Sequence, residues 1–161
     1  MQGASAQVEL AGRIVFAKGV VLAQQAAGAP RLLGSDSQLF EGDLLSAARN
    51  GFAVIEFTDG SRMTVRPATA LRISRYAHAQ ADESIALQLL RGGLRAVTGL
   101  ITKRNPDGFR IRTATATVGI RGTDFDIRLC DEDCGAEARA LAPAAPPHAR
   151  VIGRVVLTSG Q

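Results

Sequence analysis

The sequence has no tryptophan, and aromatic residues make up only 4% of its 161 residues. A hydrophobic core must therefore be built mainly from Val, Ile, Leu and Ala. Few rings are left to stack on bases and no nucleic-acid reader motif is present, so we expect no nucleic acid as a partner. The net charge of +4 comes from basic residues scattered singly, which is typical of a solvated basic surface.

Long hydrophobic runs are missing as well. No apolar stretch approaches the roughly 18 residues that a membrane span requires, and the hydrophobic part of a secretory signal peptide is absent. The small residues Ala4–Ala6, followed by Gln7, resemble the end of a signal-peptide cleavage site. We therefore expect Met1 to stand close to the N-terminus of a mature secreted protein, with residues 1–11 forming a tail. The alternative is that these are merely small residues in a floppy tail, without a cleavage site.

Residue types suited to catalysis are scarce. The two histidines, His78 and His148, stand in polar or proline-rich connections, where we expect exposed loop residues rather than bases or ligands. No Gly-rich phosphate-binding loop is found. We expect a non-enzymatic protein with no cofactor and no metal site.

The two cysteines, Cys130 and Cys134, frame three acidic residues. A disulfide can close so short a loop, and an oxidising compartment would permit it. The acidic residues match neither a zinc site nor an EF-hand. We predict a Cys130–Cys134 disulfide, with metal binding and free thiols as the alternatives.

Short apolar runs separated by turn residues, among them 17 glycines, fill most of the chain. This pattern predicts an all-β domain of ten or more short strands in a compact roll, a barrel-like or a sandwich arrangement. We assign residues 12–161 to a single domain. The Ala- and Pro-rich stretch 130–150 has no strand pattern, so we expect a long loop there, with a short helical turn at 136–141, before a closing strand at 151–159.

The segment Ser84–Leu94 admits two interpretations. Its apolar side chains recur at intervals of two, two and one, at Ile85, Leu87, Leu89 and Leu90. These intervals are closer to the period of a strand than to that of a helix, so we favour a strand and keep a helix as the alternative. Gly92-Gly93 then predicts a hairpin turn.

The clearest hairpin surrounds Thr58-Asp59-Gly60. A three-residue loop would place Glu56 opposite Arg62, with Gly60 in the left-handed conformation that suits glycine. This register gathers an apolar set on one face, namely Ala53, Ile55, Phe57, Met63 and Val65. A two-residue loop would mix arginines into that face, so we prefer the three-residue loop.

The stretch ATVGIRGTDFDIRL, residues 116–129, is strand-like but contains an arginine between two glycines. Its apolar residues are even-numbered up to Ile120 and odd-numbered from Phe125 onward. Because side chains alternate between the faces of a strand, a straight strand would expose one of these sets. We predict that the inward face switches near Gly122, at a bulge or where the chain passes from one sheet to another.

Arg121 lies beside this break. A partly buried arginine needs carboxylate or carbonyl partners, because an unpaired buried charge is costly. We expect Arg121 to be a structural clamp, with Asp124 as a candidate partner. A ligand contact and a solvated position are the alternatives.

Four segments of this chain follow one another in a known order: GRIVFAKGVVL, LFEGDLLSAARNGFAVIEFTDGSRMTVRPATALRIS, LQLLRGGLRAV and ATATVGIRGTDFDIRL. In this they closely resemble the FecR domain family, over residues 12–129. The Gly-Asp, Asp-Gly-Ser and Arg-Gly-Thr elements carry most of the resemblance. They assign a structural signature to Gly42, Asp43, Asp59, Gly60, Arg121, Gly122, Thr123 and Asp124. The shared pattern also suggests Asp43 as a second candidate partner of Arg121.

The resemblance implies an all-β domain of the bacterial cell envelope, usually periplasmic. In the founding members it belongs to a membrane-spanning regulator that receives a signal from an outer-membrane siderophore transporter and controls an extracytoplasmic sigma factor. The 161 residues contain no cytoplasmic anti-sigma segment and no membrane span. We therefore expect a periplasmic or secreted protein-binding or scaffolding module with a part in envelope signalling, whose partner is another envelope protein or a fused domain. A small-ligand or glycan sensor is the alternative.

Overall fold

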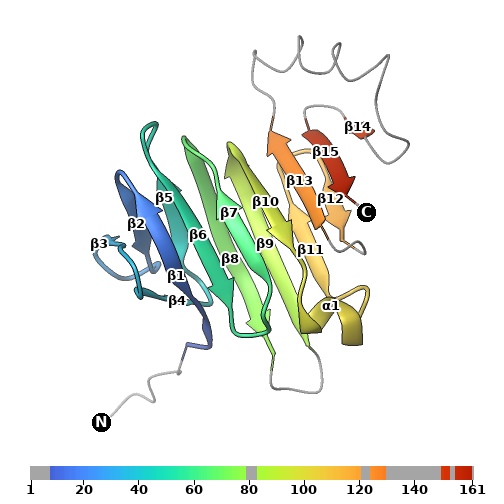
Figure 1. Cartoon of the computed structure of the whole chain (residues 1–161), viewed down its shortest axis with the longest axis horizontal. Coiled ribbons are helices and arrows are strands. Elements are labelled where there is room, and N and C mark those ends of the chain that lie inside the picture. The colour runs from blue at the N-terminus through green and yellow to red at the C-terminus, as the bar shows by residue number, and fades with distance from the viewer. Residues whose placement is uncertain (1–7, 79–82, 121–123, 130–149, 153–154, 161) are drawn as a thin grey trace.

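The strands form two sheets that stack face to face (Figure 1). The structure is a computed structural model and describes residues 8–78, 83–120, 124–129, 150–152 and 155–160. One sheet has eight strands in the order β14-β15-β13-β10-β7-β6-β1-β4, and the other has seven in the order β12-β11-β9-β8-β5-β2-β3. The predicted all-β class is confirmed, and the arrangement is a sandwich rather than a closed barrel.

The eight-stranded sheet consists of β1 (Leu10–Lys18), β4 (Gln38–Phe40), β6 (Phe52–Phe57), β7 (Arg62–Val65), β10 (Gly93–Val97), β13 (Asp124–Leu129), β14 (Arg150–Ile152) and β15 (Val155–Gly160). The seven-stranded sheet consists of β2 (Val21–Gln24), β3 (Arg31–Leu32), β5 (Leu44–Ala47), β8 (Thr69–Ala77), β9 (Ser84–Arg91), β11 (Phe109–Arg112) and β12 (Thr117–Gly119). Among the neighbouring strands of the described residues, only β9 and β11 pair in parallel.

The core lies between the two sheets and follows the alternation of the strands. Inward side chains of β6 and β9 are buried, while their outward neighbours are half-buried or exposed. Two aromatic pairs join the sheets, because Phe57 stacks on Tyr76 with centroids 5.6 Å apart and Phe109 meets Phe125 edge-on at 5.5 Å. Apart from these rings the core is aliphatic, as the composition requires.

Three of the six phenylalanines stand outside this core. Phe16 is 47% exposed, and Phe40 and Phe52 are only half-buried. In β1 the pairing register shifts between Ile14 and Phe16, which indicates a bulge. A bulge reverses the alternation of side chains, so Phe16 turns outward beyond it.

The prediction of a hairpin at Gly92-Gly93 is wrong. β9 belongs to the seven-stranded sheet and β10 to the eight-stranded sheet, so the chain crosses between the layers at this point. Gly92 has a φ of +79°, and a Cβ on it would lie 2.6 Å from Thr69 Cα. The buried Thr69 hydroxyl accepts a hydrogen bond from Gly93 N over 3.0 Å and fixes the crossing. A glycine pair permits either geometry, and only the packing of two layers selects the crossing.

The predicted switch of inward face in residues 116–129 is confirmed. Val118 belongs to the seven-stranded sheet with β12, whereas Phe125 and Ile127 belong to the eight-stranded sheet with β13. These side chains and that of Ile120 are all buried. The chain therefore passes from one sheet to the other between Ile120 and Phe125, while Gly122 itself lies outside the described residues.

The part of the chain after β10 differs from the prediction in two ways. The short helix α1 (Leu100–Arg104) follows β10, where the sequence suggested no helix. Two antiparallel strands, β14 and β15, occupy the stretch expected to hold one closing strand. The helical turn predicted at 136–141 and most of the predicted loop fall outside the described residues.

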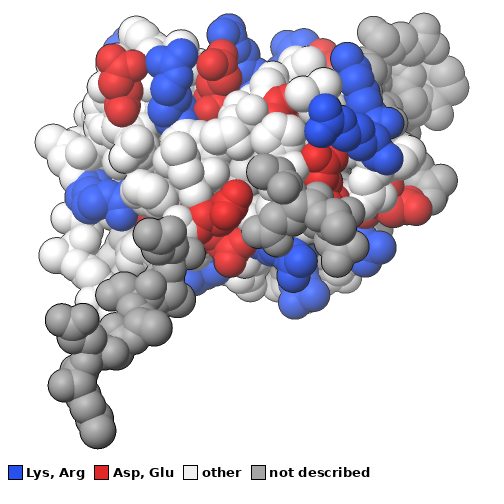
Figure 2. Space-filling view, turned by 90° about the horizontal axis from the view of Figure 1, so that it is seen from below, with Lys and Arg blue, Asp and Glu red and all other residues white. Residues whose placement is uncertain are grey.

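Charged side chains on the outer face of the eight-stranded sheet are paired across strands. Glu56 accepts hydrogen bonds from Arg62 at 3.0 Å and from Arg13 at 3.4 Å, and Arg95 bonds Asp124 at 2.8 Å. Figure 2 shows acidic and basic side chains side by side along the upper edge of the molecule. Pairing of this kind leaves little uncompensated charge on this sheet.

Candidate functional site

The hairpin between β6 and β7 has the predicted register. Glu56 pairs with Arg62, and Phe57 N donates to Ser61 O over 2.9 Å around the three-residue loop. Gly60 has a φ of +85°, as the loop requires. The predicted apolar face is buried as a whole, at Ala53, Ile55, Phe57, Met63 and Val65.

We expect Gly60→Val to lower the free energy of unfolding by more than about 1 kcal/mol, since a β-branched side chain is strained at positive φ. No atom lies within 4 Å of a Cβ added at Gly60, so backbone strain alone sets the cost. Gly34→Val is the control, because Gly34 has equally open surroundings and no positive φ. Urea denaturation should show a loss only for Gly60→Val; equal losses would contradict the assigned turn.

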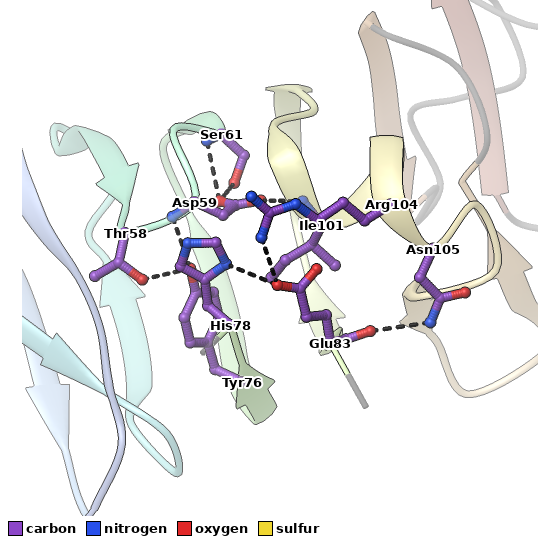
Figure 3. Close-up of polar contacts among 9 residues, drawn as sticks. All are labelled: Thr58, Asp59, Ser61, Tyr76, His78, Glu83, Ile101, Arg104 and Asn105. Carbon is purple, nitrogen blue, oxygen red and sulfur yellow. Dashed lines mark hydrogen bonds and ion pairs between the residues drawn. The ribbon is translucent and has the colours of Figure 1, made fainter. Parts of the chain in front are cut away.

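Asp59, at the tip of this hairpin, is 1% exposed and holds three segments together (Figure 3). Its carboxylate accepts hydrogen bonds from Ser61 N at 3.0 Å, from the Ser61 hydroxyl, and from Ile101 N at 3.2 Å. Its own N–H donates to the Tyr76 hydroxyl over 3.0 Å. These contacts fasten α1 and β8 to the hairpin and form what we call the Asp59 cluster. The sequence pointed to Asp59 but not to Tyr76 or α1.

Tyr76 is the side chain on which the Asp59 cluster rests. Its hydroxyl lies 2.8 Å from the Thr58 hydroxyl, and its ring is 1% exposed. Burial, which disfavours the phenolate, raises the pKa of Tyr76 to about 12. The hydroxyl therefore stays protonated at neutral pH and acts as a structural hydrogen-bonding group.

Beside this cluster, Glu83 gathers a second set of polar groups (Figure 3). Its carboxylate lies 2.9 Å from Arg104 Nη1 and 3.7 Å from His78 Nδ1, and its carbonyl accepts from the Asn105 amide. The prediction of an exposed His78 is wrong, since its side chain is only 21% exposed. His148 lies outside the described residues.

Asp43, another signature carboxylate, is completely buried. It accepts hydrogen bonds from both Arg31 Nη atoms at 3.1 and 2.9 Å, from Gln25 Nε2 at 2.8 Å and from Phe40 N at 2.9 Å. We call these four residues the Asp43 cluster. Gly42, next to Asp43, has a φ of +90° and donates its N–H to Ile73 O. Neither Arg31 nor Gln25 stood in a recognisable motif.

The predicted partners of Arg121 both have basic partners of their own. Arg31 bonds Asp43, and Arg95 bonds Asp124 and holds the pKa of that carboxyl below its ordinary value. Arg121, Gly122 and Thr123 lie outside the described residues, so the clamp stays a prediction. The same holds for the Cys130–Cys134 disulfide.

The carboxylates of Asp43 and Asp59 are occupied by hydrogen bonds within the fold. Four donors fill the acceptor positions of Asp43, which is the capacity of a carboxylate. The carboxylate of Asp59 accepts hydrogen bonds from three donors. Within the described ranges, no three His, Cys, Asp or Glu side chains are grouped so that they could hold a metal ion. In the same part of the chain no helix is long and apolar enough to cross a membrane.

An open strand edge with exposed aromatic rings offers a different kind of site. β1 runs to Lys18, but its pairing with β4 covers only Leu10–Arg13. Ile14 still exchanges backbone hydrogen bonds with Asp36 and Ser37, so the edge of β1 is free only beyond Ile14. Beyond that point Phe16 packs on Phe52 of β6, with ring centroids 5.4 Å apart. We call Phe16, Phe52 and the free edge of β1 the Phe16 patch. Backbone groups at a free edge, next to exposed rings, can accept an extended segment of another protein.

Comparison with known proteins places the chain in a family. The family model described as FecR protein matches residues 43–141, more than half of the chain, including Asp43, the hairpin and the passage between the sheets. No curated protein and no solved structure matches this sequence. On the extent of the family match, the chain belongs to the FecR family.

Proposed function

We propose that this chain is a periplasmic or secreted protein-binding module that accepts an extended segment of another envelope protein at the Phe16 patch. The FecR family is a signalling and regulatory family of the bacterial envelope, not one of enzymes. The observation that carries the proposal is the free edge of β1 beside the exposed ring of Phe16 and the half-buried ring of Phe52. Such edges pair with other strands unless they are protected, and exposed apolar patches mark interaction surfaces.

Photo-crosslinking in the living envelope tests this proposal. A photoreactive phenylalanine analogue at Phe16 should give a discrete adduct with one envelope protein. The same analogue at Leu32, which is 71% exposed on the other sheet, should give none. An equally strong adduct from both positions would contradict the assignment of the binding site.

Phe52→Glu provides the corresponding loss of function. With the analogue at Phe16, this substitution should reduce the adduct at least tenfold, because a carboxylate would replace the ring that packs beside the edge. The half-buried ring lies on the outer face, so the free energy of unfolding should fall by no more than about 1 kcal/mol. Leu32→Glu in the same background is the control and should leave the adduct unchanged. An adduct that survives Phe52→Glu would exclude the Phe16 patch.

A further inference from the structure

The strands of the seven-stranded sheet carry charges of one sign only. No strand of this sheet contains Asp or Glu. Four outward arginines, which we call the arginine face, come from two strands: Arg72 and Arg75 from β8, and Arg110 and Arg112 from β11. The eight-stranded sheet, in contrast, presents paired charges.

The strand register gathers these arginines into a flat array. In one row Arg75 pairs with Ala86 of β9, and Ala86 pairs with Arg110. In the next row Gln88 of β9 stands between Arg72 and Arg112 in the same way. Since neighbouring strands lie about 4.8 Å apart, the arginines of each row stand roughly 10 Å apart, and the rows are about 7 Å apart. Ala86, between Arg75 and Arg110, is too small to form the side of a pocket that could enclose a small ligand.

Among the residues that the structure describes, the arginine face has almost no partners. Within the described part of the chain, Arg72, Arg110 and Arg112 form neither an ion pair nor a side-chain hydrogen bond. Arg75 donates only to the Ser84 hydroxyl, at 3.0 Å. Their guanidinium groups are free for external anions, and such groups bind phosphate with two parallel hydrogen bonds.

Two exposed leucines stand on the same outer face, Leu90 between the arginine-bearing strands and Leu32 on the edge strand β3, three strands from β8. Leu32 of β3 is 71% exposed and pairs with the outward Leu22 of β2. Leu90 of β9 is 48% exposed and follows Gln88 on the same side of its strand. A soluble anion or an acidic polymer would make no favourable contact with exposed leucines. A lipid surface would, because apolar side chains enter the boundary between headgroups and acyl chains.

We propose that the outer face of the seven-stranded sheet docks on an anionic membrane surface. The arginine face contacts lipid phosphates, and Leu32 and Leu90 enter the interfacial layer. The chain then lies against a bilayer through one sheet and presents the Phe16 patch of the other sheet to a protein partner. Charge complementarity supports the choice of occupant, because anionic headgroups attract clustered arginines at short range.

Vesicle sedimentation of the whole chain tests this docking. The protein should bind vesicles containing 30% phosphatidylglycerol at low salt, and should bind vesicles of phosphatidylcholine alone at least tenfold more weakly. The double variant Arg110→Glu/Arg112→Glu should lose at least tenfold in affinity. Arg49→Glu/Lys103→Glu is the matched control, since both pairs change the net charge from +4 to 0 and the control residues are exposed and lie outside the strands of this sheet. The control should keep most of the affinity.

Leu32→Ser/Leu90→Ser separates a membrane from a soluble polyanion. The leucine variant should bind anionic vesicles at least threefold more weakly at a fixed salt concentration and should bind soluble dextran sulfate as the unchanged protein does. No binding to anionic vesicles would overturn the proposal, as would equal losses in both charge variants. Leucine substitutions without effect on vesicle binding would also overturn it and would indicate an acidic polymer as the partner.

Discussion

Gly92→Ala is expected to destabilise the protein by about 3 kcal/mol or more, from strain at positive φ and from a clash with backbone atoms. Gly92 has a φ of +79°, and a Cβ would lie 2.2 Å from Thr69 Oγ1, 2.6 Å from Thr69 Cα and 2.7 Å from Ala68 O. Only the hydroxyl can rotate away, and that rotation would break its bond with Gly93 N. The substitution therefore disturbs the crossing between the two sheets.

Gly60→Ala separates the two causes of this loss. Gly60 has a similar φ of +85° but open space where its Cβ would stand, so this variant should lose only about 1 kcal/mol. Guanidinium denaturation followed by circular dichroism measures both free energies of unfolding. If Gly92→Ala does not fold, its soluble yield beside that of Gly60→Ala gives the comparison. Equal stability of the two variants would show that the crossing tolerates a side chain.

Asp43→Ala is expected to cost about 3 kcal/mol, because it leaves several donors without their acceptor. Phe40 N and the Gln25 amide lose a partner in a part-buried setting, and Arg31 loses both of its hydrogen bonds to the carboxylate. Arg31 is 38% exposed and can turn toward water, which keeps the loss below that of a fully buried ion pair. Asp43→Asn should not restore stability, since its amide would direct hydrogens at groups that are themselves donors.

The control for this experiment is an exposed ion pair. Asp36 bonds Arg13 at 3.0 Å with its side chain 83% exposed, and its φ is +68°. Asp36→Asn removes the ion pair but keeps a side chain that tolerates this conformation, so it should cost no more than about 1 kcal/mol. Thermal unfolding at neutral pH compares the variants. A similar small loss for Asp43→Ala would mean that the Asp43 cluster does not hold β3 and β4 to the end of the sandwich.

Much of the fold was accessible from local patterns. The hairpin at Thr58-Asp59-Gly60 follows from turn chemistry and alternation, which act over a few residues. The break between Ile120 and Phe125 follows from the parity of apolar positions alone. The hairpin predicted at Gly92-Gly93 failed for a physical reason, because two glycines permit a tight turn and a crossing equally well. Which of the two forms depends on the second layer that packs below.

The site was only partly accessible in this way. The signature marked Asp43 and Asp59, yet it gave no sign that Arg31, Tyr76 and α1 would supply their partners. These partners are separated from the carboxylates by 12 to 42 positions in the chain. Pairing over such separations is decided by the topology of the sheets, not by local sequence.

The sequence by itself determined the all-β class, the aliphatic core and the hairpin register, because period-two alternation and turn residues are local properties. The tertiary structure alone decided how charge is distributed. Because the arginines are scattered along the chain, the sequence predicts only a solvated basic surface. β9 lies between β8 and β11, and the parallel pairing of β9 with β11 aligns the outward positions of all three strands. Arg72 and Arg75 thereby reach the same face as Arg110 and Arg112, and a dispersed charge becomes a basic surface.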